Sequence, residues 1–518
     1  MDELKFDIRI ATEERLLVDV RGFHIPLNCI TFLFGESGIG KSLISKAIYG
    51  LLDPDEFAVT INGKDYDRYL RTEETRRIKE NGFFVFQEPS SHLNPLLPLG
   101  VQLREGSLSK APNESELLRQ LWDTDSVAPV QKLLEVYPKP YRPSGGEKQR
   151  MFLAMALKKI DIVLKEQRLS NDTLFVFDEP TGSLDNHFRN VFLSLLIQRF
   201  QAQPLTTLLI THDYSMVSEV VRAHPNLLDK VLFKELRLER VRGASGHQQL
   251  VLKSFQPQSY LGWLESQSEQ PAQPASGQRK LLLRVERDVE VFGQRLAISK
   301  NPEDSHPSPL ELHSGAITYL KAPSGTGKTT LVKMIMGLVH GTRLRLSLNG
   351  MVLTERTPRR FWHRHVWGKK MTMVFQHADE ALNPRSTVKE AFRGLPSETR
   401  ITESHVRETL GELFDVELID ELLGKRVSAL SGGQKQRLNL LRALFLDTDI
   451  LILDEPLNGL DFESITRVLG MLKEKQRAGK GILLISHNEE IFDAVVPTES
   501  VYYLKSEPSI RANAASIR

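Results

Sequence analysis

The stretch Gly35-Glu36-Ser37-Gly38-Ile39-Gly40-Lys41-Ser42 follows the apolar run Ile30–Phe34 and precedes a helical pattern over residues 42–51. A strand that ends in a glycine-rich turn and continues as a helix is a phosphate-binding arrangement, because backbone N–H groups and the helix N-terminus point at the anion. Lys41 is expected to reach the β and γ phosphates, and Ser42 to ligate Mg²⁺. The stretch therefore predicts an α/β fold with a buried parallel sheet that binds a nucleotide.

A second copy of this arrangement reads Ala322-Pro323-Ser324-Gly325-Thr326-Gly327-Lys328-Thr329, between the apolar run 316–320 and a helical pattern over 329–339. Lys328 and Thr329 correspond to the lysine and serine of the first copy. Four further motifs recur in the same order in both copies: Gln87 and Gln376, Ser144-Gly145-Gly146-Glu147 and Ser431-Gly432-Gly433-Gln434, Asp178-Glu179 and Asp454-Glu455, and His212 and His487. Five motifs in the same order, twice, indicate two related nucleotide-binding domains.

The acidic pairs Asp178-Glu179 and Asp454-Glu455 each follow four apolar residues, 174–177 and 450–453. A buried strand would deliver the first carboxylate beside the phosphate loop, where it can hold Mg²⁺ through water. The second carboxylate would orient or deprotonate the attacking water.

The histidines His212 and His487 follow further apolar runs, 207–210 and 482–485. An imidazole at this position could hydrogen-bond the γ phosphate and help to hold the water. A single histidine at a strand end is more often structural, but its recurrence after the second acidic pair favours a functional role.

The Ser-Gly-Gly motifs allow two interpretations. Ser144 with Glu147, and Ser431 with Gln434, fit the capping box that starts a helix, here over 148–157 and 435–444. Two glycines after the serine also leave a helix N-terminus rich in free N–H donors, which suits a γ phosphate. A domain with its own phosphate loop has no need of a second one, so such a site would serve the nucleotide of the opposite domain.

Composition indicates a two-domain protein without a disulfide framework. The chain has 518 residues, a net charge of +2 and one cysteine, Cys29, which is expected to be a small buried hydrophobe in a reducing compartment. The longest apolar runs, such as 206–210 and 450–453, are far shorter than the ~20 residues of a membrane helix. We therefore expect a cytoplasmic protein, with other chains spanning the membrane if it works there.

The domain boundaries follow from a change in composition. Residues 255–278 include a stretch of Pro, Gln, Ser and Gly without apolar periodicity, which is typical of a flexible linker. We place domain 1 at 1–254 and domain 2 at 279–518. The apolar residues of 260–264 suggest a short docking helix or turn before the polar stretch.

The order of the motifs, together with Ser183-Leu184-Asp185 and Gly459-Leu460-Asp461, resembles the nucleotide-binding domains of ABC ATPases. The resemblance covers nearly the whole chain apart from the linker. It implies two P-loop NTPase domains of the ABC type, each with a mainly parallel sheet core, an antiparallel β subdomain and a helical subdomain. It also implies head-to-tail pairing of the domains within one chain, with each ATP between one domain's phosphate loop and the other's Ser-Gly-Gly signature, and therefore one chain per complex.

Site residues carry over from the family motif by motif. The residues implied for ATP are Gly35, Ser37, Gly38, Gly40, Lys41, Ser42, Gln87, Ser144, Gly145, Gly146, Asp178, Ser324, Gly325, Gly327, Lys328, Thr329, Gln376, Ser431, Gly432, Gly433, Gln434 and Asp454. The residues implied for Mg²⁺ are Ser42, Gln87, Asp178, Thr329, Gln376 and Asp454. The catalytic residues implied are Glu179, Glu455, His212 and His487.

A finer resemblance lies after the two glutamines. Leu93-Asn94-Pro95 and Leu382-Asn383-Pro384 stand at the same spacing from Gln87 and Gln376, as in the ATPase subunits of oligopeptide, dipeptide and nickel importers, and Tyr137-Pro138 also fits. This resemblance implies an ATPase on the inner face of the cell membrane, with two transmembrane permease subunits and a solute-binding protein as partners. The solute would be peptide-like or of a metal type.

A soluble role is the alternative. Neither half has the His-Pro-Tyr tail or the cysteine cluster of those importer subunits, and the same motif style occurs in accessory ATPases of carbon–phosphorus lyase complexes. Such a protein would be a motor or assembly factor for a cytoplasmic enzyme complex. The excision-repair and ribosome-recycling types need cysteine clusters, and chromosome-maintenance types need long heptad arrays, so the sequence disfavours all three.

The basic and aromatic stretch 359–370 raises the question of nucleic acid, because such side chains can stack on bases and bind phosphates. It occupies the segment before the Gln376 motif, where the first half also has basic residues. We interpret it as a solvated face or a contact with a membrane partner, and we predict no nucleic-acid partner.

The two halves differ where they would share one site. Ala322 replaces the first glycine of the second phosphate loop, and Pro143 and Glu147 replace the Leu and Gln usual in the family signature. We therefore predict two unequal ATP sites, an efficient one with Glu179 as its base and a slower one with Glu455. The insertion 158–170 receives no function. Phe292 is either a platform for stacking on adenine or a core phenylalanine, and Phe6 is a less convincing candidate for stacking.

Overall fold

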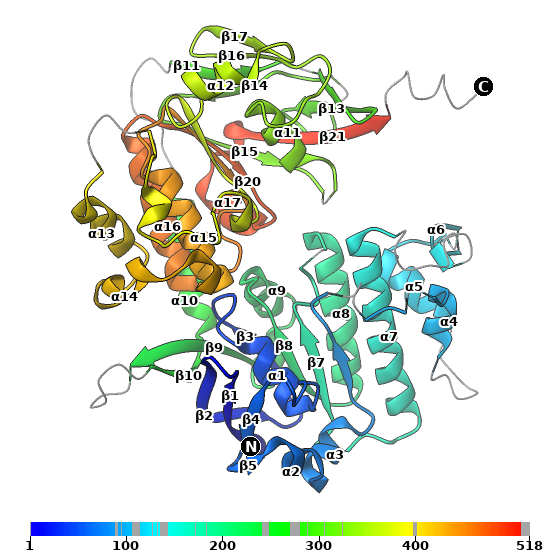
Figure 1. Cartoon of the computed structure of the whole chain (residues 1–518). Coiled ribbons are helices and arrows are strands. Elements are labelled where there is room, and N and C mark those ends of the chain that lie inside the picture. The colour runs from blue at the N-terminus through cyan, green and yellow to red at the C-terminus, as the bar shows by residue number, and fades with distance from the viewer. Residues whose placement is uncertain are drawn as a thin grey trace. The chain divides into compact units, whose positions relative to one another are not determined.

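Two compact units, Met1–Tyr260 and Leu261–Arg518, make up the chain in a computed structural model (Figure 1). The structure describes residues 2–88, 92–94, 96–105, 114–126, 128–131, 133–134, 143–170, 172–182, 184–240, 248–269, 280–286, 288–304, 306–323, 325–396 and 401–508. The division between the units falls inside the segment 255–278. Residues 257–269 of the predicted linker form a helix, α10 (Pro257–Glu269), which includes the predicted docking residues 260–264. Residues 270–278 of the predicted linker lie outside the described residues.

The described residues of unit 1 form one sheet of ten strands, in the order β5-β4-β1-β2-β10-β9-β3-β8-β7-β6. The strands are β1 Glu3–Ala11, β2 Leu16–Pro26, β3 Ile30–Phe34, β4 Ala58–Ile61, β5 Lys64–Asp65, β6 Phe83–Val85, β7 Leu174–Asp178, β8 Thr206–Ile210, β9 Val231–Arg240 and β10 Gln248–Ser254. Strands β9, β3, β8, β7 and β6 pair in parallel, and β3, β7 and β8 are buried along their whole length. Continuous apolar runs form these strands because helices cover both faces of a parallel sheet.

The helices of unit 1 carry the sheet's crossovers and a separate helical part. They are α1 Lys41–Tyr49, α2 Tyr66–Leu70, α3 Glu73–Lys79, α4 Leu99–Arg104, α5 Glu114–Trp122, α6 Ala128–Gln131, α7 Gly145–Lys165, α8 Asn186–Ala202 and α9 Ser215–Ala223. Strand β10 joins the antiparallel strands to the parallel ones, and it pairs with β2 only through Leu250 and Val20.

Unit 2 has two separate sheets among its described residues: β14-β11-β16-β17, which is antiparallel, and β12-β13-β21-β15-β20-β19-β18. Its strands are β11 Leu281–Val285, β12 Asp288–Val291, β13 Gln294–Ser299, β14 Leu310–His313, β15 Ile317–Lys321, β16 Arg345–Leu348, β17 Met351–Thr354, β18 Met371–Val374, β19 Ile450–Asp454, β20 Gly481–Ile485 and β21 Val501–Pro508. Its helices are α11 Lys328–Ile335, α12 Arg359–His365, α13 Glu403–Gly411, α14 Ile419–Gly424, α15 Gly432–Leu444, α16 Phe462–Arg477 and α17 Glu489–Val495.

Each unit therefore contains a mainly parallel core, antiparallel strands and a helical part, and the predicted fold class is confirmed. The parallel order β21-β15-β20-β19-β18 repeats that of β9-β3-β8-β7-β6. As a result, the phosphate loops, glutamines, acidic pairs and histidines all follow carboxyl ends of neighbouring strands, where ligands of such sheets bind. Cys29 is buried, as expected.

The insertion 158–170 lengthens a helix. Helix α7 has 21 residues, whereas the corresponding α15 has 13. In the additional turns, the Asp161 carboxylate accepts hydrogen bonds from Nε and Nη2 of Arg199, at 2.6 and 2.7 Å, on α8. Lys158 is buried and donates to Leu103 O and, at 2.6 Å, to Glu114 Oε1. The insertion thus ties α7 to α4, α5 and α8.

No helix in the described part of the chain has both the length and the apolarity needed to cross a membrane.

Candidate nucleotide-binding sites

The first phosphate loop curls around the side chain of its own lysine. It leaves β3 and enters α1 through Gly35, Gly38 and Gly40, which have φ values of 142°, 80° and 111°. Nζ of Lys41 donates to Gly35 O at 2.6 Å and to Glu36 O at 3.0 Å. Burial lowers the pKa of Lys41, and the nearby carboxylates oppose this effect. An ammonium group at the centre of the loop is suitably placed for the β and γ phosphates.

The second phosphate loop has the same design with one difference in backbone. Nζ of Lys328 donates to Ala322 O and to Pro323 O, the latter at 3.2 Å, and Gly325 and Gly327 have φ values of 78° and 100°. A Cβ on Gly35 would lie 2.7 Å from Leu236 O, whereas Ala322 is not among the described residues with positive φ. The alanine is therefore accommodated by an ordinary conformation. The predicted Ser324 lies outside the described residues.

The first carboxylate of each acidic pair lies at the end of its strand, buried. Oγ of Ser42 donates to Oδ1 of Asp178 at 2.9 Å, while Oδ2 is a buried acceptor without a hydrogen-bond partner among the described residues. Burial raises the pKa of Asp178 to about 6. Burial also raises the pKa of Asp454, and no hydrogen bond of good geometry reaches either of its oxygens from the described part of the chain.

These unsatisfied oxygens test whether the site fits Mg²⁺. A buried ionised carboxylate without donors is costly, and a hard cation with oxygen ligands relieves that cost. Ser42 with Asp178 and Thr329 with Asp454 supply hydroxyl and carboxylate oxygens, so the residues present fit the ion.

The two predicted glutamines lie at the same sheet edge. Gln87 follows β6, whose Val85 pairs with Phe177, and Gln376 follows β18, whose Val374 pairs with Leu453. Gln87 is exposed and Gln376 half-buried. None of the contacts described for the chain joins either glutamine to an aspartate, so their role as Mg²⁺ ligands stays a prediction.

The second carboxylate of each pair meets its histidine differently in the two units. In unit 1, Oε2 of Glu179 lies 2.9 Å from Nδ1 of His212. Burial would raise the pKa of Glu179, but His212 outweighs burial through its charge and hydrogen bond, and the net pKa is lowered; the carboxylate in turn raises the pKa of His212.

In unit 2, the carboxylate of Glu455 binds mainly to groups other than the imidazole. Its Oε2 accepts from Ser486 Oγ at 2.8 Å and from the backbone N–H of His487 at 3.1 Å, while Nε2 of His487 lies 3.5 Å from Oε1. Burial raises the pKa of Glu455 to about 7. The two units thus hold equivalent glutamates in different electrostatic settings.

Both glutamates have a left-handed backbone. Their φ values are 46° for Glu179 and 50° for Glu455, and each backbone N–H donates at 2.9 Å to the last strand residue before the histidine loop, Ile210 O or Ile485 O. A non-glycine residue in this region is strained, and such strain gathers at functional sites.

The Ser-Gly-Gly motifs are capping boxes in the structure. Ser144 caps α7, with its N–H donating to Glu147 Oε2 at 2.8 Å, and Ser431 caps α15, with its N–H donating to Gln434 Oε1 at 3.1 Å. The helices begin at Gly145 and Gly432, so the glycine N–H groups stand in the first turn, where the helix itself leaves them unpaired. Their predicted role at a γ phosphate stays open at this point.

Several residues of the sites were not singled out from sequence. In unit 1, Arg189 forms an ion pair with Asp213, the residue that directly follows His212 in the chain. In unit 2, Nε2 of Gln436 donates to the backbone oxygen of Glu455 at 3.3 Å. Sequence could have drawn attention to Asp213 and Ser486, because they adjoin the histidines.

The two candidates for stacking on adenine differ in their exposure to solvent. Phe292 is 84% exposed in the turn between β12 and β13, and its ring is free of the core. Phe6 is 1% exposed and belongs to the core, so the prediction that it could stack on a base is wrong.

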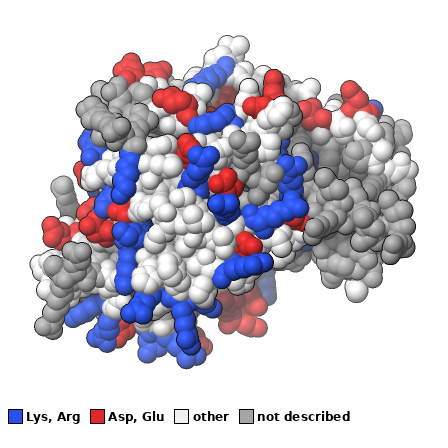
Figure 2. Space-filling view, turned by 90° about the horizontal axis from the view of Figure 1, so that it is seen from above, with Lys and Arg blue, Asp and Glu red and all other residues white. Residues whose placement is uncertain are grey.

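The basic and aromatic stretch 359–370 contributes partly to the core. Trp362 is buried against Gly337, and Nε1 of Trp367 donates to Met336 O at 2.7 Å. Figure 2 looks onto the end of unit 2 that carries α12 and β17, where Lys and Arg side chains are separated by uncharged surface and by Asp and Glu.

Comparison with known proteins agrees with the duplicated sites. The family model for the ABC transporter matches residues 19–182 and 306–458. An uncharacterized ABC transporter ATP-binding protein of Escherichia coli (strain K12), YejF, is 28% identical over 520 residues, which cover 96% of this chain and 92% of that protein. The glutathione import ATP-binding protein GsiA of the same organism is 25% identical, over 91% of this chain and 79% of that protein.

Among solved structures, the fold is similar to that of an archaeal ribosome recycling factor, aABCE1, in complex with a stalk protein. The TM-score is 0.57 at 19% identity, covering 97% of this chain and 90% of that one. A second similar structure is the RNase-L inhibitor, with a TM-score of 0.53 at 20% identity, over 98% and 92% of the two chains. At this identity the likeness shows the fold alone.

Proposed function

This chain belongs to the ABC transporter family, and we propose that it is the ATPase that drives import of a peptide-like or metal-type solute through separate membrane subunits. It has two ATP-binding domains of this family and is an ATPase. The observation that carries the proposal is similarity over 91% of the chain to a protein named a glutathione import ATP-binding protein, together with two phosphate loops that each hold their lysine in place.

Within each unit we assign roles by position. Lys41 and Lys328 bind the β and γ phosphates, and the glycine N–H groups around them complete the cradle. When bound beside Asp178 or Asp454, Mg²⁺ neutralises charge on the phosphates. Glu179 and Glu455 accept the proton of the attacking water at a carboxylate oxygen.

The histidines and the signatures complete the assignment. His212 and His487 orient the water or the γ phosphate. The first-turn N–H groups of α7 and α15 bind the γ phosphate held by the opposite unit, so that two ATP molecules close the units head to tail. In this pairing Ala322 and the Pro143-Glu147 signature fall in one site, which we assign as the slower one, with Glu455 as its base.

A cavity in each unit supports docking onto membrane partners. In unit 2 a cavity of about 660 Å³ borders β18 just before Gln376, and Leu338, Trp367 and Phe375 are among its lining residues. In unit 1 a cavity of about 420 Å³ borders β6 just before Gln87, and it is lined in part by Phe83 and Leu93.

The two cavities border corresponding strands, β18 and β6, one in each domain, and the cavity of unit 2 extends further, over residues 363–369. Two cavities fit two permease subunits on the inner face of the cell membrane. A subunit docked in either cavity would lie close to the glutamine loop of that domain. A solute-binding protein would deliver the solute on the other side.

Co-purification tests this function. The tagged chain, recovered from detergent-treated membranes of its source cells, is expected to bring with it a pair of membrane-spanning proteins, identified by mass spectrometry. Recovery with soluble enzyme subunits alone would instead support the motor of a cytoplasmic complex.

A matched pair of variants tests the cavity. Leu338, 39% exposed, lines the cavity of unit 2, and Val352, 58% exposed, does not. Leu338→Glu is expected to lose the membrane partners while Val352→Glu retains them. Retention by both variants would remove this cavity as the docking site.

A further inference from the structure

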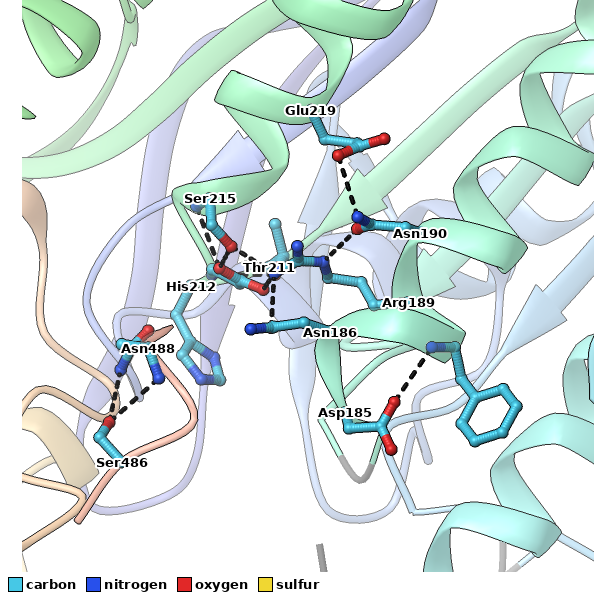
Figure 3. Close-up of polar contacts among 12 residues, drawn as sticks. Asp185, Asn186, Arg189, Asn190, Thr211, His212, Ser215, Glu219, Ser486 and Asn488 are labelled. Carbon is cyan, nitrogen blue, oxygen red and sulfur yellow. Dashed lines mark hydrogen bonds and ion pairs between the residues drawn. The ribbon is translucent and has the colours of Figure 1, made fainter. Parts of the chain in front are cut away.

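Arg189 is a buried arginine that contacts the loop carrying His212 in unit 1, and it has no role among those assigned above. The Arg189 side chain is 7% exposed on the first turns of α8. Its Nη1 donates to Asn186 Oδ1 at 3.0 Å, to Asp213 Oδ2 at 2.8 Å and to Ser215 Oγ, and its Nε donates to Asn190 Oδ1 at 2.9 Å (Figure 3). The guanidinium thus joins the start of α8 to the loop that carries the histidine.

This loop is held on both sides of His212. The N–H of Asp213 donates to Thr211 Oγ1 at 3.0 Å, and the N–H of Ser215 donates to Asp213 Oδ1 at 3.0 Å. His212 lies between Thr211 and Asp213, with its Nδ1 2.9 Å from Glu179 Oε2. A displacement of the Asp213 carboxylate would therefore turn the histidine backbone and move the imidazole away from Glu179.

Helix α8 is also tied to the next helix. Nδ2 of Asn190 donates to Glu219 Oε2, on α9, at 2.9 Å (Figure 3). Asn186 directly follows Asp185, which caps α8 by accepting from the N–H of Phe188 at 3.1 Å. The network therefore extends from the end of the Ser183-Leu184-Asp185 motif to both sides of the histidine.

Unit 2 shows that the fold does not need this charge. Asp461 caps α16 as Asp185 caps α8, and the residue four positions later is Ile465, buried in place of Arg189. After His487 stands Asn488, whose N–H donates to Ser486 Oγ at 3.1 Å, and the Ser486 hydroxyl donates to Glu455. The imidazole of His487 lies 3.5 Å from Glu455, farther than its counterpart.

A buried ion pair contributes little net stability compared with apolar packing, because burying the charges offsets their attraction. The charge-assisted hydrogen bonds of an arginine instead fix the relative positions of the groups that it joins. We propose that Arg189 is a positioning residue: through Asp213 it holds His212 on Glu179 and couples this contact to the start of α8, so that the histidine and glutamate of unit 1 lie closer together than those of unit 2. The proposal rests on the roles assigned above to Glu179 and His212.

The test uses the full chain carrying Glu455→Gln, so that turnover reports on Glu179. Arg189→Ile introduces the residue that unit 2 has, and it is expected to lower kcat by about 3- to 30-fold with little change in KM for ATP. Arg189→Lys, which keeps the charge, is expected to recover part of the loss. If Arg189→Ile does not fold, Asp213→Asn is the second variant. It introduces the asparagine that unit 2 has at this position and is expected to lower kcat by the same factor.

A double-mutant cycle decides whether Arg189 acts through the histidine. In a His212→Ala background, Arg189→Ile is expected to lower kcat no further. A full additional loss, or a rise in KM with kcat unchanged, would overturn the positioning role. If His212→Ala itself leaves kcat unchanged, the assignment of His212 fails, and with it any action of Arg189 through that residue.

Discussion

The hydroxyl of Ser486 donates a hydrogen bond to Oε2 of Glu455 at 2.8 Å. This contact and the N–H of His487 are the donors that partly offset burial, which nevertheless raises the pKa of this carboxylate to about 7. Glu179, which has His212 at 2.9 Å, has a lowered pKa. The pKa values of these equivalent glutamates are thus shifted in opposite directions.

The first prediction concerns stability against pH without metal or nucleotide. An unfolded glutamate titrates near 4.3, whereas folded Glu455 titrates near 7, so its contribution is full below pH ~4.3 and is lost as the pH rises through 7. Glu455→Gln should remove this loss, which amounts to up to about 4 kcal/mol. Thermal unfolding between pH 5 and 8 in EDTA measures it.

Two further variants provide a second test and a control for that measurement. Ser486→Ala removes a donor to the carboxylate and should move the pH dependence to higher pH. Glu355→Gln, an exposed change in the same unit, should leave the dependence as in the wild type. An unaltered pH dependence in Glu455→Gln would contradict the raised pKa.

The second prediction concerns the first residue of each phosphate loop. Gly35→Ala forces a side chain onto φ 142° and within 2.7 Å of Leu236 O, and it should cost about 1–3 kcal/mol and weaken ATP binding by unit 1. Ala322→Gly relieves no strain and should change stability by less than about 1 kcal/mol. Calorimetry and nucleotide titration measure both, and equal effects would count against the difference between the loops.

The third prediction concerns Mg²⁺. Asp178→Asn keeps the shape but removes the charge beside Ser42, so most of the gain in ATP affinity on adding Mg²⁺ should be lost from this site, about tenfold or more. Titration of ATP with and without EDTA measures the gain. Asp55→Asn, exposed in the same unit, is the control, and a full Mg²⁺ gain in Asp178→Asn would exclude this carboxylate as a ligand.

The fourth prediction concerns the lengthened helix. Lys158→Met keeps the aliphatic stem but removes the buried ammonium group that donates to Leu103 O and Glu114, and it should destabilise unit 1 by about 2–4 kcal/mol. The neighbouring Lys159 is half-buried, and Lys159→Met should cost less than about 1 kcal/mol. Thermal unfolding compares them, and similar losses would show that the Lys158 contacts contribute nothing specific.

Local patterns predicted what depends on local structure. The apolar runs before Gly35 and Asp178 became strands because a buried parallel strand is apolar on both faces. Ser144 with Glu147 became a capping box because both partners lie within one helical turn.

Tertiary contacts explain what sequence missed. Arg189 meets Asp213, 24 residues later in the chain, only because side-chain hydrogen bonds join the start of α8 to α9 and to the loop before it. The short helix or turn expected at 260–264 is the centre of a longer helix, α10, whose buried Tyr260 and Leu264 are packed in the fold. Phe6 is a candidate for stacking because of its position in the sequence before the phosphate loop. Along β1, however, residues alternate between a buried and an exposed face, and Phe6 lies on the buried face.

The left-handed backbone at Glu179 and Glu455 has an evolutionary consequence. Holding a non-glycine residue in this conformation costs about 1–2 kcal/mol at each position. The only gain from it is that the carboxylate is placed at the site. A copy released from catalysis would gain stability by drifting to glycine or asparagine at this position. Among relatives of this chain, a glycine or asparagine at either position would therefore mark the half that has stopped hydrolysing ATP, before its phosphate loop decays.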